Sequence, residues 1–314
     1  MRAIVPTLWA DGSAAAVADF YTSVFRDARE TNRTHYPTEG LPDFQQHMAG
    51  EILTLDLEIH GLRISVINAG DEFRPNPAAG FMVNLDPAFL EDPRGYLDSL
   101  FAALSEGGRV LMELGEYPFS PRYAWVEDRF GVSWQLILTD PTGEPRPTVL
   151  PALMFCGPAQ NRAVEAGRAY TNLFPGSRLG TAVHYPQQTG PATTDGVMFS
   201  EFRLGPAQDD PREEFWVTAM DSAVEQDFTF TPGFSLLVEA EGQEEIDRLW
   251  AALSRHPEDE QCGWCRDAFG LSWQIVPADL GELMRAPGAH QALMGMKKIE
   301  IAGFGTHGLL SNPH

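Results

Sequence analysis

The sequence predicts an α+β protein made of two copies of one small domain in tandem. A chain of 314 residues is long enough for two domains of ordinary size. Three segments of the first half return in the same order in the second half: YTSVF at 21–25 as YTNLF at 170–174, YLDSLFAALS at 96–105 as EIDRLWAALS at 245–254, and DRFGVSWQLI at 128–137 as DAFGLSWQIV at 267–276. The first two pairs are offset by 149 residues and the third by 139, a difference of hairpin length.

The first half of each copy is expected to hold one module of strands and one helix. A short apolar run at 3–10 ends at an Asp-Gly turn and predicts a strand. Apolar residues then recur at helical spacing, with Ser13 at the expected N-cap. Residues 51–60 alternate between apolar and polar and predict a half-buried strand, and Gly61 turns the chain into another strand at 62–70.

The pattern then restarts in a second module. A strand is predicted at 81–86, followed by a helix at 92–108 that stops at a Gly-Gly pair. Further strands are predicted at 109–117, 123–131 and 133–140. Each copy therefore holds two β-α-β-β-β modules, and the chain holds four.

Prolines mark the boundary between the copies. The segment around residues 141–149 holds three prolines and one glycine, which suits neither a helix nor a central strand. We therefore expect copy one at 1–140, a linker at 141–149, copy two at 150–284 and a C-terminal tail at 285–314.

The composition disfavours several classes of partner. The chain has 44 acidic and 22 basic residues, a net charge of −22, and so lacks the clustered cations that bind nucleic acid or anionic membranes. The N-terminus does not resemble a signal peptide, and no apolar stretch approaches the roughly 18 residues of a membrane span. We expect a cytoplasmic protein whose acidic residues form a solvated surface.

The three cysteines are expected to be ordinary reduced thiols. Cys262 and Cys265 form a C-x-x-C pair, and Cys156 stands alone. A redox pair would need a helix N-terminus, whereas the flanking residues predict strand and turn. A zinc site would need a second ligand pair nearby, and the sequence offers no obvious one.

Both closing motifs, Asp128–Ile137 and Asp267–Val276, resemble those of PhnB-like proteins. The opening strand-turn-helix block, the Cys-Gly-Trp at 262–264 and the tail at 292–304 share this resemblance, which covers the chain to about residue 304. PhnB-like proteins belong to the vicinal oxygen chelate superfamily, with glyoxalase I, extradiol dioxygenases and fosfomycin- and bleomycin-resistance proteins. The resemblance implies two glyoxalase/bleomycin-resistance-like domains, each made of two βαβββ modules with curved sheets around a cavity.

The resemblance also implies where a metal would be bound, and this chain departs from that pattern. Metal enzymes of the superfamily place a His at the start of a first strand and a Glu on a last strand. Proline stands at the first place, as Pro6 and Pro151, and glutamine at the second, as Gln135 and Gln274. At the inner strands the match falls on Phe81 or Met82 and on Ser235. We therefore expect no metal and no cofactor, because a neutral amide is a weak ligand for a hard divalent cation.

Seven residues are candidate ligand-binding positions. Strand alternation places Gln135 on the face opposite Trp134, and the resemblance implies that the glutamines face the cavity while Trp134 and Trp273 pack in the core. Aromatic side chains near the expected cavity would suit a flat or apolar molecule, or would simply fill the interior. The predicted ligand-binding residues are Trp9, Tyr123, Trp125, Gln135, Phe155, Trp264 and Gln274.

Catalytic candidates are weaker. Glu58 and His60 share a predicted strand face and could form an acid–base pair, or could simply be exposed. The second copy offers Glu201 and Arg203 instead, so at most one copy would use this pair. PhnB-like sequences are sometimes labelled as a ubiquinone-pathway methyltransferase, but the chain shows no nucleotide-type glycine loop for such a cofactor.

The sequence thus favours a metal-free protein that binds a small molecule in a cavity, of the sequestering or resistance type. A glyoxalase-like lyase or isomerase, or another enzyme of the superfamily with an unconventional metal site, is the alternative. A structural role with both cavities filled by side chains is a third possibility. The expected partner is a small molecule, without nucleic acid or membrane, and the chain is expected to be a monomer that forms an intrachain pseudo-dimer, or a homodimer.

Overall fold

The computed structural model describes residues 1–305, so residues 306–314 of the predicted tail lie outside the described part. The first copy folds into two β-α-β-β-β modules, as predicted. In chain order its elements are β1 (Ala3–Asp11), α1 (Ala14–Val24), β2 (Ala28–His35), η1 (Asp43–Met48), β3 (Ile52–Ile59), β4 (Leu62–Ala69), β5 (Ala79–Leu85), α2 (Pro93–Ser105), β6 (Arg109–Tyr117), β7 (Ser120–Glu127) and β8 (Ser133–Leu138).

The second copy follows the same plan until its last module. Its elements are β9 (Val149–Phe155), η2 (Gly157–Ala159), α3 (Ala163–Leu173), β10 (Arg178–His184), β11 (Val197–Arg203), η3 (Pro211–Glu213), β12 (Trp216–Asp221), β13 (Phe234–Ala240), α4 (Gln243–Leu253), η4 (Pro257–Asp259), β14 (Trp264–Arg266) and β15 (Ser272–Pro277). After α4 only two strands follow where three were expected, because this copy has ten fewer residues there and the short η4 takes the place of a strand.

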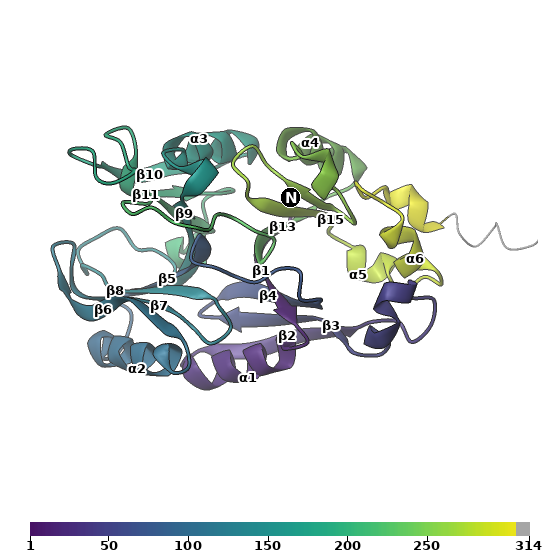
Figure 1. The fold of residues 1–314 in the computed structure, drawn as a ribbon, viewed down its shortest axis with the longest axis horizontal. Helices are drawn as coiled ribbons and strands as arrows, with labels where there is room; N and C mark the ends of the chain where they lie inside the picture. The colour runs from purple at the N-terminus through teal and green to yellow at the C-terminus, as the bar shows by residue number, and fades with distance from the viewer. Residues whose placement is uncertain (306–314) are drawn as a thin grey trace, which may run out of the picture.

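Each of the two sheets combines one module from each copy. The seven-stranded sheet has the order β14-β15-β13-β1-β4-β3-β2, and the eight-stranded sheet has the order β10-β11-β12-β9-β5-β8-β7-β6. The copies meet at antiparallel pairs, β1 with β13 and β5 with β9. Figure 1 shows α1 and α2 along one long side of the molecule and α3 and α4 along the opposite side. The predicted fold class is confirmed, and every concave face is shared between the copies.

The core lies between the sheets and these helices. Trp134 and Trp273 are fully buried there, as predicted, and pack edge-on against Tyr21 and Tyr170 at 5.2 and 5.3 Å between ring centroids. Trp134 also stacks on Phe81. The helix-facing side of each last strand is therefore a core position.

The repeated Asp-x-Phe-Gly motif has a structural cause. The buried Asp128 carboxylate accepts hydrogen bonds from Tyr21 Oη (2.7 Å), Trp134 Nε1 (2.9 Å) and the backbone N–H groups of Phe130 and Val132. The following Gly131 has a φ of +83°, a conformation that favours glycine. Asp267 forms the same four bonds in the second copy. The motif thus joins the last hairpin of a copy to that copy's first helix.

The C-terminal residues add a part that copy one lacks. Helices α5 (Leu280–Leu283) and α6 (Ala289–Met294) and the turn η5 (Ile301–Gly305) lie at one end of the molecule, beside the η1 loop (Figure 1). They form a small apolar cluster with Leu237 and Val276 of the seven-stranded sheet. No helix of the described residues is long and apolar enough to span a membrane.

Candidate functional site

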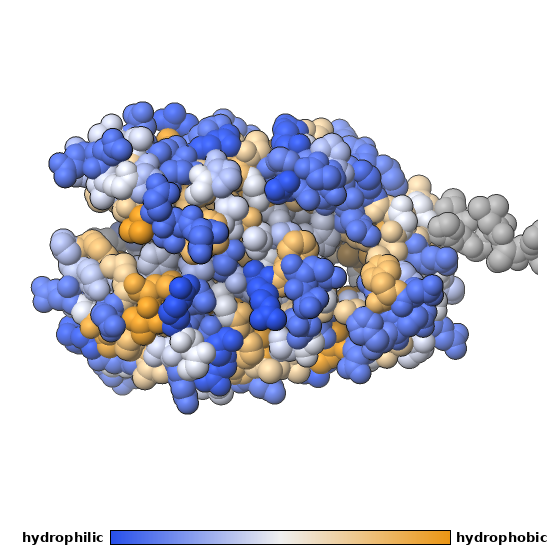
Figure 2. Space-filling view, in the orientation of Figure 1, coloured by the Kyte–Doolittle hydropathy of each residue, from blue (hydrophilic) through white to orange (hydrophobic). Residues whose placement is uncertain are grey.

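The larger of the two described cavities lies on the concave face of the seven-stranded sheet. Its volume is about 1280 Å³, which is ample for a small ligand. Strands of both copies form its floor, and the η1 loop with α5 and α6 encloses it from the other side. The space-filling view shows a hollow beside the C-terminal helices (Figure 2).

Strand alternation places hydroxyl and apolar groups on the cavity floor. Val5 and Trp9 line the cavity, whereas Ile4 and Leu8 face the core. Pro6 has the parity of Ile4 and Leu8, so its side chain points to the core. The prediction that Pro6 occupies the place of a metal-ligating histidine was therefore one residue out of register. The residue that faces the floor is Thr7, which lies opposite Ser235 and beside Ser65. Pro151 likewise has the parity of the core residues of β9.

The structure brings Trp9, Trp264 and Gln274 together in this cavity. Gln274 donates from Nε2 to Ser235 Oγ at 2.9 Å and lies opposite Trp264 in the strand register. The ring centroids of Trp9 and Trp264 are 5.8 Å apart in an edge contact, and Trp9 Nε1 donates to the Gly70 carbonyl oxygen at 2.7 Å. These three side chains come from β1, β14 and β15, and so from both copies.

Three other candidates lie on the concave face of the eight-stranded sheet. Tyr123 Oη donates to Gln135 Oε1 at 3.0 Å, and Trp125 Nε1 donates to Ser133 Oγ at 2.7 Å. Burial raises the pKa of Tyr123, so this phenol stays protonated at neutral pH. The side-chain oxygen of Gln135 thus has its partner on the neighbouring strand of the same sheet.

Phe155 is a core residue and not a cavity residue. It is fully buried on the helix-facing side of β9, where it packs against Phe230 and Phe269. The prediction failed because alternation along β9 was not used to assign its face, although Leu150 and Ala152 occupy the concave side.

Glu58 and His60 do not form an acid–base pair. Glu58 binds the Arg29 guanidinium at 2.7 and 3.1 Å on the outer part of the sheet. His60 lies in the tight turn after β3 with a φ of +46°, and its Nε2 is 2.9 Å from Tyr96 Oη. Burial lowers the pKa of His60, which favours its neutral form. Neither residue lines either described cavity, because the strand ends before His60.

Both copies of the chain match a known family profile. The sequence profile described as 3-demethylubiquinone-9 3-methyltransferase matches residues 2–137 and again residues 147–276. The chain belongs to this PhnB-like family. A search of curated proteins finds no match.

Two solved structures are similar to part or most of this chain. A PhnB protein of Bacillus cereus, also described as a 3-demethylubiquinone-9 3-methyltransferase, is 27% identical over 44% of this chain and 100% of its own, with a TM-score of 0.37. A glyoxalase I variant from Zea mays is 13% identical over 88% of this chain and 93% of its own, with a TM-score of 0.51. The latter shares the fold across both copies.

In this PhnB-like chain the residues present do not fit the superfamily's metal. The centre of the floor offers Thr7, Ser65, Ser235 and Gln274, which are weak ligands for a divalent cation. The nearby floor carboxylates already have partners, since Glu239 is paired with Arg63 and Asp56 accepts from Asn32. Within residues 1–305, the group of acidic and His side chains close enough to share an ion is His256, Glu258 and Asp259. Arg266 forms ion pairs with both of these carboxylates, and both are exposed.

The two concave faces of the PhnB-like chain differ. On the eight-stranded sheet, Arg146 of the linker forms two bonds with Glu201, at 2.7 and 3.0 Å, and its guanidinium carbon lies 3.8 Å from the Trp216 ring centroid. In the large cavity, by contrast, Arg63 Nε and His290 Nδ1 are buried atoms without hydrogen-bond partners. Glu201 and Arg203, which copy two has in place of Glu58 and His60, thus have structural roles. Glu201 binds Arg146, and Arg203 binds Glu214.

Sequence reasoning missed the residues that roof the cavity. The tail was given no role, yet α6 supplies His290, whose Nε2 is 3.2 Å from Gln45 Oε1 of η1. The available signal was the apolar pattern after the last strand, which has no counterpart at the end of copy one. The cysteines carry no signal of reactivity: burial raises the pKa of Cys156 and Cys262 to about 11 and that of Cys265 to about 12, and all three are free thiols.

Proposed function

We propose that this PhnB-like protein binds a neutral or cationic, partly apolar small molecule in the cavity of the seven-stranded sheet, as a sequestering protein without a conventional metal centre. The observation that carries the proposal is the cavity floor. Hydroxyl and amide groups stand there beside Val5 and Leu237, so the floor can hold a ligand by packing and a few hydrogen bonds.

The charge of the lining selects against anions. Among the described residues, one guanidinium lines the cavity, that of Arg63, and it forms an ion pair with Glu239. The carboxylates that line it are Asp11, Glu39, Asp56, Asp71, Glu72, Glu239, Glu258, Asp259 and Glu260. Phosphate esters and carboxylic acids would meet a negative potential there, whereas a cation would be attracted.

Aromatic side chains supply the wall on which such a ligand would lie. Trp9 is fixed by its hydrogen bond to Gly70 and contacts both Trp264 and Phe73, the latter at 5.1 Å between centroids. A ring face near acidic groups favours flat apolar bodies and organic cations. Trp264 lies on the edge strand β14 and Trp9 near the end of β1, so both border the space instead of filling it.

A ligand screen tests the proposal. We expect neutral and cationic compounds from a metabolite and antibiotic library to raise the melting temperature, and anionic ones to have no effect. Trp264→Ala should weaken the binding of a hit about tenfold by isothermal titration, which corresponds to the loss of one aromatic contact. Trp125→Ala is the matched control, since Trp125 is the equivalent residue on the other sheet, opposite Gln135.

Two results would overturn the proposal. One is a hit whose affinity depends on Trp125 and not on Trp264. The other is a divalent metal that elemental analysis finds bound in stoichiometric amount and that is lost in Gln274→Ala, since this would place a metal centre on the floor.

A further inference from the structure

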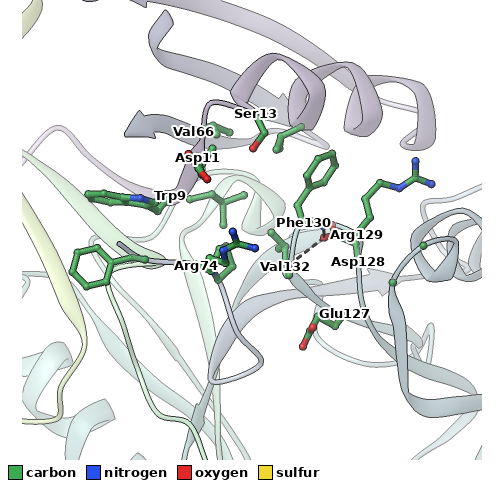
Figure 3. Close-up of a pocket in the computed structure, with 18 of the residues that line it drawn as sticks. Trp9, Asp11, Ser13, Val66, Arg74, Glu127, Asp128, Arg129, Phe130 and Val132 are labelled. Atoms are coloured by element: carbon green, nitrogen blue, oxygen red, sulfur yellow. Dashed lines mark hydrogen bonds between the residues drawn. The ribbon is translucent and has the colours of Figure 1, made fainter. Parts of the chain in front are cut away.

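A second cavity, of about 540 Å³, is lined by copy one and adjoins the larger cavity, with which it shares Trp9, Asp11 and Phe73. It is bordered by the end of β1, the start of α1 and the β7–β8 turn. Figure 3 shows Asp11 and Ser13 at the top of the cavity, Phe130 to the right, and Arg74 below Asp11 and beside Val132. Ser13 lines this cavity and not the larger one, so a substitution at Ser13 changes the lining of this cavity alone.

The second copy shows what fits in this place. Repeat alignment makes Arg162 the counterpart of Ser13, and Ala268 and Phe269 the counterparts of Arg129 and Phe130. The Arg162 guanidinium carbon lies 4.5 Å from the Phe269 ring centroid, and its Nη1 donates to the Ala268 carbonyl oxygen at 2.6 Å. Copy two thus fills the equivalent space with a guanidinium of its own.

In copy one the counterparts of these two partners, the Arg129 carbonyl oxygen and the Phe130 ring, have no guanidinium from residues 1–305 bound between them. Ser13 is too short to reach across, and among the described residues no group donates to the Arg129 carbonyl oxygen. The Arg129 side chain does not take its place, because its guanidinium lies over Phe20 at 4.5 Å and donates to the Glu106 carbonyl oxygen. The ring of Phe130 and one carbonyl oxygen therefore face an open cavity.

The charges around the cavity leave one acid and one base available. Arg109 is paired with Glu127, and Asp128 is enclosed by its four donors. Asp11 and Arg74 form no ion pair or side-chain hydrogen bond with any described residue. In copy two the cation Arg162 is paired with Glu165, whose counterpart in copy one is Ala16, so Asp11 is the carboxylate left to meet a cation.

We propose that this cavity binds a small zwitterion with a guanidinium or alkylammonium group, of the class of basic amino acids. The cationic group lies over the Phe130 ring and donates to the Arg129 carbonyl oxygen and to Asp11, as Arg162 does toward Phe269 and Ala268 in the second copy. The carboxylate of the ligand meets Arg74.

Titration with free L-arginine, followed by calorimetry or NMR, tests this inference. We expect saturable binding to the full chain and a loss of affinity of at least about tenfold in Ser13→Arg, because the introduced side chain occupies the site as Arg162 does. Ser13→Ala is the matched control and should bind as the unmodified chain does. Asp11→Asn and Arg74→Ala should each weaken arginine binding, and agmatine, which lacks the carboxylate, should bind more weakly than arginine.

Each alternative result is decisive. The inference is wrong if arginine shows no saturable binding, or if Ser13→Arg binds it as well as Ser13→Ala does. Thermal unfolding of Ser13→Arg checks that the fold is intact, and a melting temperature equal to that of Ser13→Ala makes the comparison valid. Trp264→Ala should leave arginine binding unchanged, which separates this site from the larger cavity.

Discussion

The buried aspartate of the repeated motif gives the sharpest stability prediction. Asp128→Ala removes an acceptor of four hydrogen bonds at a residue that is 3% exposed, and it leaves a phenol, an indole and two backbone N–H groups without partners. With roughly 1 kcal/mol lost per bond, the expected cost is about 4 kcal/mol in the free energy of unfolding. Tyr21→Phe, which removes one donor, should cost about 1.5 kcal/mol.

Urea unfolding followed by tryptophan fluorescence measures these costs. Asp267→Ala should cost about the same as Asp128→Ala within roughly 1 kcal/mol, because its carboxylate accepts bonds from the same four kinds of donor. The exposed Asp140, which accepts from the backbone N–H and the hydroxyl of Thr142, is the control, and its replacement by Ala should cost less than about 0.5 kcal/mol. A cost below about 1 kcal/mol for Asp128→Ala would refute the view that this motif is structural.

Three further predictions follow from buried contacts. Arg146→Met should destabilise the protein by about 3 kcal/mol in urea unfolding, since it removes the cation that pairs with the buried Glu201 and leaves this carboxylate with the Thr181 N–H as its donor. The double variant Arg146→Met/Glu201→Met should recover most of the loss. Burial lowers the pKa of His290, so the packing of α6 on Gln45 and Tyr36 should be complete above about pH 6.5 and should weaken as the pH falls through the lowered pKa. Hydrogen exchange of the backbone amides in 289–294 should therefore become faster in acid. The variant His290→Gln should abolish this pH dependence. His60→Gln should leave ligand binding unchanged in titration, because His60 contacts Tyr96 outside both cavities; a loss of binding would restore its place in the site.

The sequence predicted the modules well because their signals are local. The alternation in 52–59 and the helical spacing in 14–24 each come from a single element that buries one face. What could not be read from the sequence is which module pairs with which. Strand β1 could pair with strands of either copy, and it lies beside β13, some 230 residues later in the chain, through backbone hydrogen bonds that depend little on side-chain identity.

The candidate site shows the same division. Gln274 was found because it belongs to the repeated motif, and Trp264 because it lies near the expected cavity; the strand register places the two opposite each other. Phe155 was assigned to the wrong face, and Glu58 and His60 were paired although a turn separates their directions. The roof of the cavity was missed because α6 contacts η1 from nearly the whole chain length away.

Sharing of the sheets has a consequence for how the two copies depend on each other. Copy one alone would expose β1 and β5 as unpaired edges, and both lie in the middle of their sheets in the whole chain. Neither half buries its own floor, since Thr7 faces Ser235 of the other copy and the Trp9–Trp264 contact also crosses between them. Folding, the large cavity and its ligand therefore require both copies together. The smaller cavity is lined by copy one alone, although copy two completes its sheets and Thr231 Oγ1 donates to the Arg74 carbonyl oxygen.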